Sequence, residues 1–264
     1  MRPVTVELAI IGGGNMGGAL LGGLIDAGTL AAAEIAVVEV RAERRAELAE
    51  LHPGIVVAEQ PVPCAAAVLA VKPGDVPATA RTVVDAGARR LLSIAAGVRL
   101  ATIEAAAGDG VAVIRAMPNT PALVRLGASA IAPGSAASAD DVAWAQAVLG
   151  AVGTVDVVEE GALDAFTGVA GSGPAYVFLV AEALVDAAVA EGFARETALR
   201  IVRQLLLGSA TLLARDGDPT QLREMVTSPN GTTAAGLARL GEHDLRGAFA
   251  DAVRAATARS RELG

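Results

Sequence analysis

Two stretches of this 264-residue sequence combine residue types that can bind charged ligands. Near the start, Gly12, Gly14 and Gly17 form the pattern G-x-G-x-x-G directly after the short apolar run LAII. Late in the chain, SPNGTT (228–233) places a proline, a glycine, an asparagine and three hydroxyls between helical patterns. The first pattern is typical of a turn that approaches a pyrophosphate, and the second of a polar loop that opens a helix.

The glycine pattern lies between a short apolar run and a helical pattern, which predicts strand, tight turn and helix. Gly12 permits the turn, Gly14 lets the backbone approach a phosphate, and Gly17 lets helix and strand pack closely. The first N–H groups of the helix then favour an anion. A glycine-rich turn with a purely structural role is the alternative, and the strand–turn–helix context favours dinucleotide binding.

In the late loop, Pro229 ends the preceding helix, while Asn230 and Gly231 tolerate positive φ. Thr232 or Thr233 then caps a new helix, whose first N–H groups point into the turn. Such a nest suits an anion, most simply a carboxylate. An ordinary capped turn is the alternative.

The elements that position the glycine turn alternate between strand and helix patterns. This alternation predicts a parallel sheet in a doubly wound α/β domain, where ligands bind beyond the carboxyl ends of the strands. The expected elements are strands at Ile35–Val40, Ala67–Val71, Arg90–Ile94 and Ala112–Arg115, and helices that include Ala42–Leu51 and Val76–Ala86.

Unusual residues gather at the expected strand ends. They read VKPGD (71–75), SIAAG (93–97) and MPNTP (117–121). Lys72 is the only lysine, and Pro73 forces it towards an extended conformation; a loop lysine that arginine could replace is the alternative. Asn119 lies in a turn bracketed by prolines, either a rigid turn with hydrogen-bonding side chains or a plain turn.

The end of the second strand gives conflicting indications of cofactor type. Glu39 falls 22 residues after Gly17, where an acid normally holds a ribose 2′-hydroxyl. Arg41, Arg44 and Arg45 follow at once, and arginine accommodates a 2′-phosphate. A solvated helix start is the alternative role for these arginines.

Strand patterns stop after Val158, and the rest of the chain reads as helices. The most apolar of them is interrupted by Glu182 and Asp186, so we interpret it as a buried helix and not a membrane span, with Pro174 at or near its first position. The expected helices are Pro174–Glu191, Arg195–Arg215, Pro219–Val226, Thr233–Leu240 and Asp244–Leu263.

Composition excludes several classes of protein. The net charge of −8 argues against a nucleic-acid footprint, which needs a basic stripe. The single cysteine, Cys64, excludes an intramolecular disulfide and a cysteine zinc cluster and fits a reducing, cytoplasmic setting. Seven glycines in Leu8–Ile25 argue against a signal or membrane segment there. We expect no metal site.

Six stretches of the sequence, taken in order, resemble the Δ1-pyrroline-5-carboxylate reductase family, and the likeness covers essentially the whole chain. The last two stretches are much more specific than the glycine pattern. In order, they read IIGGGNMGGALLGGLI, LAVKPGDV, SIAAGV, IRAMPNTPALV, TGVAGSGPAYVFLVAEALVDAAV and MVTSPNGTTAAGL.

The resemblance implies reduction of the cyclic imine pyrroline-5-carboxylate to L-proline with NAD(P)H. It implies a Rossmann-type domain, residues 1–158, and an all-α dimerisation domain, residues 159–264. The active site is shared across the homodimer, and five dimers can form a decamer. Small-molecule substrate and dinucleotide are then the partners, with neither nucleic acid nor membrane.

The resemblance also assigns the site residues. Thr233 is the catalytic candidate, understood as an orienting hydrogen-bond partner because a hydroxyl is a poor general acid. Substrate contacts fall on Glu160, Ser228, Gly231, Thr232 and Thr233. Cofactor contacts fall on Gly12, Gly14, Asn15, Met16, Gly17, Glu39, Ala70, Val71, Lys72, Pro73, Ala95, Ala96, Gly97 and Asn119.

Three features depart from the family pattern. The pair Arg223-Glu224 stands where relatives carry Lys-Asp or Arg-Asp. Asn230 replaces the first glycine of S-P-G-G-T-T, a change that the left-handed backbone tolerates. Glu39 stands where relatives often carry a small polar residue near the 2′-phosphate, so the choice between NADPH, which the family favours slightly, and NADH stays open.

Two rival functions fit the sequence less well. A β-hydroxyacid dehydrogenase would use a lysine in the helical half, which has none after Lys72. A non-catalytic dinucleotide sensor would not need the hydroxyl-rich loop.

Overall fold

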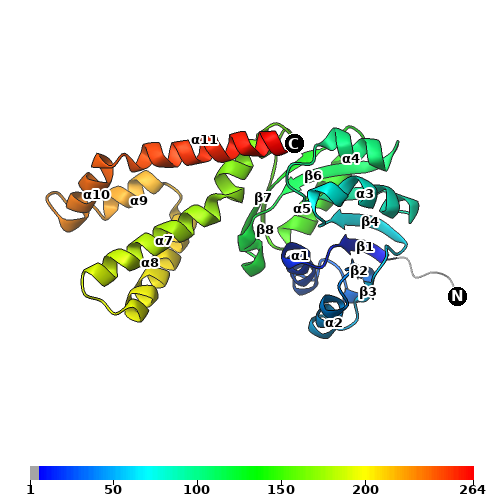
Figure 1. The fold of residues 1–264 in the computed structure, drawn as a ribbon, viewed down its shortest axis with the longest axis horizontal. Coiled ribbons are helices and arrows are strands. Elements are labelled where there is room, and N and C mark those ends of the chain that lie inside the picture. Colours follow the sequence, from blue (N-terminus) through cyan, green and yellow to red (C-terminus); the bar gives the residue numbers. More distant parts are fainter. Residues whose placement is uncertain (1–5) are drawn as a thin grey trace. The chain divides into compact units, whose positions relative to one another are not determined.

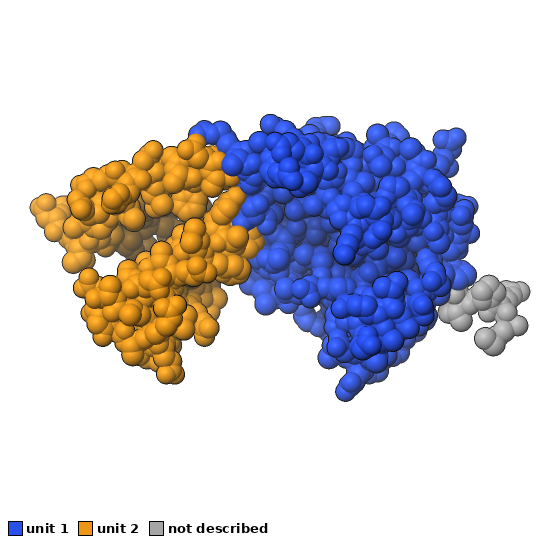
Figure 2. Space-filling model, viewed as in Figure 1, with its two compact units in different colours: residues 1–172, 254–264 blue, residues 173–253 orange. Residues whose placement is uncertain are grey.

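The computed structural model describes residues 6–264 (Figure 1). The chain forms two compact units (Figure 2). Unit 1 comprises the described residues up to Ser172 together with Arg254–Gly264, and unit 2 comprises Gly173–Val253. The predicted boundary between residues 158 and 159 differs from this division by compactness and stays a prediction, and residues 1–5 of that first domain lie outside the described residues.

Unit 1 is built on one sheet with the order β3-β2-β1-β4-β5-β6-β7-β8. The predicted parallel α/β arrangement is confirmed for β1 to β6, whereas β7 pairs antiparallel with β6. From β1 the chain adds β2 and β3 on one side, and then crosses to add β4, β5 and β6 on the other side. The boundary between the parallel strands β1 and β4 is therefore a topological switch point. In the described residues the strands are β1 Val6–Ile11, β2 Ile35–Val38, β3 Val56–Ala58, β4 Cys64–Leu69, β5 Arg90–Ser93, β6 Ala112–Met117, β7 Gly127–Pro133 and β8 Gly153–Val157.

Helices cover both faces of this sheet because strand side chains alternate between faces. Leu8 and Ile10 of β1 join the core under α1, α2 and α5, and Ala9 and Ile11 join the core under α3, α4 and α6. The helices are α1 Asn15–Asp26, α2 Ala42–Leu51, α3 Val76–Asp85, α4 Leu100–Ala107, α5 Ala139–Gly150 and α6 Ala162–Phe166.

The last residues of the chain belong to unit 1. The Ser260 hydroxyl donates a hydrogen bond of 2.8 Å to Asp164 Oδ1, and Arg99 pairs with Asp164 Oδ2 at 3.2 Å. Asp164 is buried, and Arg99 balances its charge while the Ser260 hydroxyl satisfies its other oxygen. They attach the end of the last helix to α6.

Unit 2 is helical, as predicted. Its small core contains Val185, Ala198 and Val202. The interpretation of the most apolar helix as buried is wrong for the single chain, because Val185 is the one buried residue of α7 and Phe178 is 61% exposed. The helices are α7 Gly173–Ala190, α8 Arg195–Asp216, α9 Pro219–Met225, α10 Thr232–Glu242 and α11 Leu245–Leu263, which continues into unit 1.

Two helical stretches pass a length-and-composition test for membrane spans. They are Ala162–Ala190 and Arg195–Arg215. Core helices of soluble proteins pass the same test. The expectation that neither spans a membrane stays a prediction.

Candidate active site

The carboxyl ends of four parallel strands meet at one edge of the sheet. Ile11 pairs with Leu69, Leu69 with Ser93, and Ser93 with Arg115. The sequence stretches singled out after these strands therefore start side by side. The first two follow β1 and β4, the strands that flank the switch point, where ligands bind in open α/β sheets.

The glycine turn has the geometry that a dinucleotide requires. Gly12 has φ of +108°, and a Cβ there would collide with the Ala70 carbonyl oxygen, while a Cβ on Gly17 would collide with the Gly12 carbonyl oxygen. A Cβ on Gly14 would meet no described atom within 4 Å. Gly12 and Gly17 are thus required for packing, and Gly14 leaves an open approach to the start of α1, where Asn15 is exposed and Met16 packs on the core.

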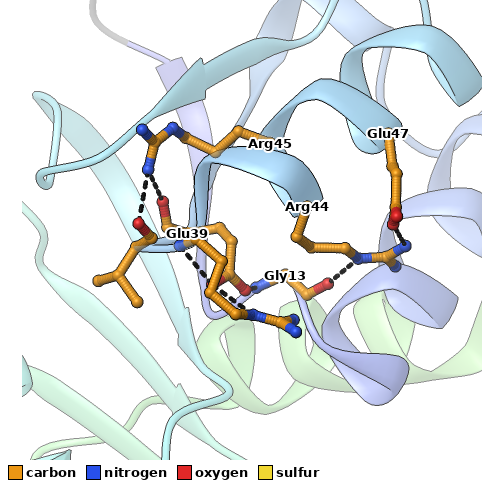
Figure 3. Close-up of polar contacts among 7 residues, drawn as sticks. Gly13, Glu39, Arg44, Arg45 and Glu47 are labelled. Atoms are coloured by element: carbon orange, nitrogen blue, oxygen red, sulfur yellow. Dashed lines mark hydrogen bonds and ion pairs between the residues drawn. The ribbon is translucent and has the colours of Figure 1, made fainter.

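Glu39, just beyond β2, turns its carboxylate onto this glycine turn (Figure 3). Its Oε2 accepts a hydrogen bond of 3.1 Å from the Gly13 N–H. Its Oε1 accepts hydrogen bonds from the Arg41 N–H at 3.0 Å and from Arg41 Nε at 3.3 Å. Burial opposes ionisation, but these hydrogen bonds and the charge of Arg41 outweigh it and hold the pKa of Glu39 below its ordinary value.

In the stretch after β4, Pro73 restricts the backbone conformation of the residue before it. Lys72 is extended, with φ −63° and ψ 149°, and is exposed, and Pro73 opens a short 3-10 turn. Ala70 receives the close approach of Gly12, and Val71 is half-buried beside it. Backbone of this stretch therefore borders the glycine turn.

The stretch after β5 serves packing at least in part. Ala95 is buried and Ala96 is exposed. Gly97 has φ of +78°, and a Cβ there would lie 3.0 Å from the Leu263 carbonyl oxygen. The contact with Leu263, near the end of α11, therefore explains why glycine stands at this position. The sequence did not indicate this contact.

Asn119 uses both ends of its amide inside the protein. Its Oδ1 accepts a hydrogen bond of 2.9 Å from the Ala128 N–H, and its Nδ2 donates one of 3.0 Å to the Ala170 carbonyl. Residue 174, four positions after Ala170, is a proline and has no N–H for that carbonyl. Asn119 thus supplies a donor to a carbonyl within the π-helical turn Thr167–Gly171.

Within the part of the chain that the structure describes, Glu160 has hydrogen-bond partners on one oxygen. Its Oε1 accepts hydrogen bonds from the Leu100 N–H at 2.7 Å and from the Arg115 guanidinium at 3.0 Å. Arg115 is only 4% exposed, so Glu160 balances a buried charge. The sequence predicts Arg115 only as the end of a strand, whereas the structure shows it buried and paired with Glu160; an arginine within an otherwise apolar strand pattern is the feature that could have indicated this pairing.

The loop of unit 2 forms the expected turn, with one correction. The predicted cap at Thr232 or Thr233 is wrong: Gly231 is the N-cap, and α10 begins at Thr232. Asn230 has φ of +59°, and a Cβ on Gly231 would collide with Ser228 Oγ. Both threonines are exposed and lie in the first turn of α10. The first backbone N–H groups of a helix have no partner carbonyl inside that helix.

Comparison with known proteins places the chain in a family. Residues 160–263 match the family model of pyrroline-5-carboxylate reductase dimerisation, and residues 7–97 match the model NADP oxidoreductase coenzyme F420-dependent. A pyrroline-5-carboxylate reductase of Synechocystis sp. is 42% identical over 266 residues, covering 99% of both chains. This chain belongs to the pyrroline-5-carboxylate reductase family. A member from Pseudomonas aeruginosa is 40% identical, over 98% of this chain and 97% of its own.

Other relatives agree with this assignment. The family member of Methanosarcina acetivorans is 47% identical over 175 residues, a match that covers 66% of this chain and 65% of that protein. The solved structure of a pyrroline-5-carboxylate reductase from Coxiella burnetii superposes with a TM-score of 0.91 at 33% identity, covering 98% of each chain. The Plasmodium falciparum enzyme, solved with NADP bound, gives 0.85 at 26% identity, also covering 98% of each chain.

Family membership confirms the predicted fold class and the reductase function, with an NAD(P)-dependent oxidoreductase domain followed by a helical dimerisation domain. The dimerisation domain indicates a homo-oligomer. The roles of individual site residues stay predictions.

Proposed function

We propose that this chain reduces 1-pyrroline-5-carboxylate to L-proline, the last step of proline biosynthesis, and that the loop Ser228–Thr233 binds the substrate carboxylate. The geometry at the start of α10 supports the proposed binding of the carboxylate. A left-handed Asn230 and the N-cap Gly231 turn the chain so that Thr232 and Thr233 occupy the first helical turn. Unpaired N–H groups there favour a negative charge by about 0.3–1 kcal/mol.

Hydroxyl donors add to this anion site. Ser228, Thr232 and Thr233 are all exposed, so their hydroxyls can donate to a carboxylate. Glu160 contacts the substrate through Oε2, since Oε1 is already bound by Leu100 and Arg115. This second oxygen can accept a hydrogen bond from the N–H of the protonated imine.

The cofactor is held by the strand ends of unit 1. Gly12, Gly14, Asn15, Met16 and Gly17 hold the pyrophosphate, because their turn is open at Gly14 and precedes the start of α1. Backbone at 70–73 and 95–97 lines the rest of the dinucleotide. When bound, the reduced dinucleotide supplies the hydride.

Thr233 orients the substrate and does not act as an acid. A threonine hydroxyl has too high a pKa to protonate an imine efficiently, so the imine binds already protonated. Holding the imine carbon in line for hydride transfer is then the main contribution of the loop. Asn119, just beyond β6, lies near the nicotinamide end of the dinucleotide, held by its hydrogen bonds to Ala128 and Ala170.

The oligomeric state and the cellular compartment are proposed from the same family. Homodimers form through the helical domain, and five dimers assemble into a decamer. The single buried Cys64 suits a reducing cytoplasm.

Oxidation of NADH and of NADPH by the purified protein, each with pyrroline-5-carboxylate, tests the proposed activity. Turnover with either cofactor supports it. Dinucleotide binding without turnover on this substrate would refute it and favour a sensor.

Replacement of Thr233 tests the role of the loop. Thr233→Val is expected to lower kcat at least about tenfold and leave dinucleotide affinity unchanged, because the lost hydroxyl touches only the substrate. Thr211→Val is the matched control, since the Thr211 hydroxyl donates to the Leu207 carbonyl within α8. Equal losses in kcat and in dinucleotide affinity would contradict the assigned role.

A further inference from the structure

The position of Glu39 bears on which dinucleotide this reductase uses. NADH and NADPH differ only at the ribose next to adenine, where NADH has a 2′-hydroxyl and NADPH a 2′-phosphate. The acidic residue at the end of the second strand is the group that meets this ribose in dinucleotide-binding sheets. Here Glu39 follows β2 directly and is tied to the glycine turn through Gly13 (Figure 3).

The carboxylate of Glu39 has one acceptor position left. An ionised carboxylate offers about four lone-pair sites, two on each oxygen. Among the described residues, Oε1 accepts from the N–H and from Nε of Arg41, and Oε2 accepts only from the Gly13 N–H. A ribose hydroxyl can donate to the remaining site on Oε2. A phosphate at neutral pH carries mainly acceptor oxygens and negative charge, and has no such donor to offer.

Glu39 is also held in place. It is 8% exposed, and the backbone N–H groups of Gly13 and Arg41 fix both of its oxygens. The same hydrogen bonds keep the pKa of the carboxyl low, so it is charged at neutral pH. Rotating the side chain away from a 2′-phosphate would break these hydrogen bonds.

The nearby arginines are committed to the protein itself. Arg44 Nε donates to the Gly13 carbonyl at 2.7 Å, and its NH1 pairs with Glu47 at 2.9 Å. Arg45 NH1 donates to the backbone carbonyl of Glu39 and to that of Val40, each at 2.8 Å. Figure 3 shows both guanidinium groups facing these partners.

Arg41 is the remaining candidate for a 2′-phosphate. Its side chain is 62% exposed, and its Nε donates to Glu39. A phosphate that recruited Arg41 would still lie against the carboxylate that Arg41 now neutralises. One exposed arginine therefore does not offset the nearby buried carboxylate.

We propose that Glu39 makes this reductase select NADH over NADPH, by accepting a hydrogen bond from the ribose 2′-hydroxyl and repelling a 2′-phosphate. This inference rests on the proposed cofactor site at the glycine turn. It assigns Arg44 and Arg45 to bracing that turn and the end of β2.

Direct binding tests the inference without any turnover. Dissociation constants of NADH and NADPH, and of ADP-ribose and its 2′-phosphate, are measured by calorimetry on the purified full-length protein at fixed salt. We expect at least about tenfold tighter binding of each ligand without the 2′-phosphate, a modest value for one close pair of like charges. Equal binding, or tighter binding of the phosphorylated ligands, would overturn the inference.

A variant pair isolates the carboxylate. Glu39→Ser is expected to reduce the preference for NADH at least about tenfold, because it removes the charge and the acceptor together. Glu47→Ser is the matched control: it removes the same charge from α2, where Glu47 is 60% exposed and pairs only with Arg44 among the described residues. An unchanged preference in Glu39→Ser, with an unchanged circular dichroism spectrum, would also overturn the inference. Loss of turnover alone, with the binding preference intact, would count against the proposed reaction and not against Glu39.

Discussion

The hydrogen bonds of Asn119 predict a sharp loss of stability on its removal. Asn119→Ala leaves the Ala128 N–H and the Ala170 carbonyl without their side-chain partner. Each hydrogen bond contributes about 1 kcal/mol, and a group left unsatisfied adds to that cost. Because the site is half-buried, we expect a total loss of about 2–3 kcal/mol. At roughly 2–4 °C per kcal/mol for a chain of this size, the melting temperature falls by about 5–10 °C.

A second variant tests the reason for this loss. Pro174→Ala restores an N–H four residues after Ala170, so the carbonyl gains a donor within the helix. In that background Asn119→Ala is expected to cost about 1 kcal/mol less. Melting temperatures of the four proteins, taken by calorimetry at one protein concentration, measure this coupling. No loss in Asn119→Ala, or the same loss in both backgrounds, would refute the reasoning.

Two further predictions concern unit 1. Ser138 is the N-cap of α5, and Asp141 completes its capping box by accepting hydrogen bonds from the Ser138 N–H at 2.9 Å and hydroxyl at 2.6 Å, while it also pairs with Arg90 at 2.6 Å. Burial opposes its ionisation, but the Ser138 and Arg90 hydrogen bonds outweigh it and lower its pKa. Asp141→Asn is therefore expected to cost about 1–2 kcal/mol at pH 7 in urea unfolding. Since a lowered pKa stabilises the fold above the ordinary value of 3.8, the difference from wild type should narrow only below that pH, and a narrowing near neutral pH would contradict this account. Burial raises the pKa of the Cys64 thiol to about 11, so we expect iodoacetamide at pH 8 to label it only after unfolding; rapid labelling of the folded protein, followed by mass spectrometry, would contradict this burial.

Much of unit 1 was predictable because its local patterns agree with its tertiary contacts. The bounds of α2, Ala42–Leu51, match the prediction at both ends. The glycine pattern also gave the turn, because the close contacts of Gly12 and Gly17 permit no side chain. Such positions are readable from sequence since only one residue type fits them.

Strands made of small residues were harder to predict. The strand Gly127–Pro133 reads GASAIAP, which has weak β propensity and no clear alternation, and Val56–Ala58 is only three residues long. Their strand character comes from pairing with neighbours and not from local preference. The antiparallel direction of β7 has no local signature for the same reason.

The residues of the candidate site were predicted from the sequence, but the residues that they contact were not. The family pattern marked Glu160, Asn119 and Gly97, yet each has a partner far away in sequence: Arg115, Ala170 and Leu263 respectively. One of these was open to inference, since a carbonyl four residues before Pro174 needs another donor. The other two depend on how the chain returns to the sheet.

The two units differ in how they are stabilised, and this difference connects assembly to function. Unit 1 closes its own cores on both faces of the sheet. Unit 2 buries few apolar side chains and leaves others, such as Phe178, Leu179 and Leu207, more than 60% exposed. Apolar surface of this kind on a dimerisation domain is stabilised by burial against another subunit. The loop Ser228–Thr233 belongs to unit 2, so we expect its order to depend on helices whose apolar faces are covered on assembly. On this reasoning, we expect dissociation of the oligomer to weaken binding at the proposed substrate site as well as to lower the stability of the chain.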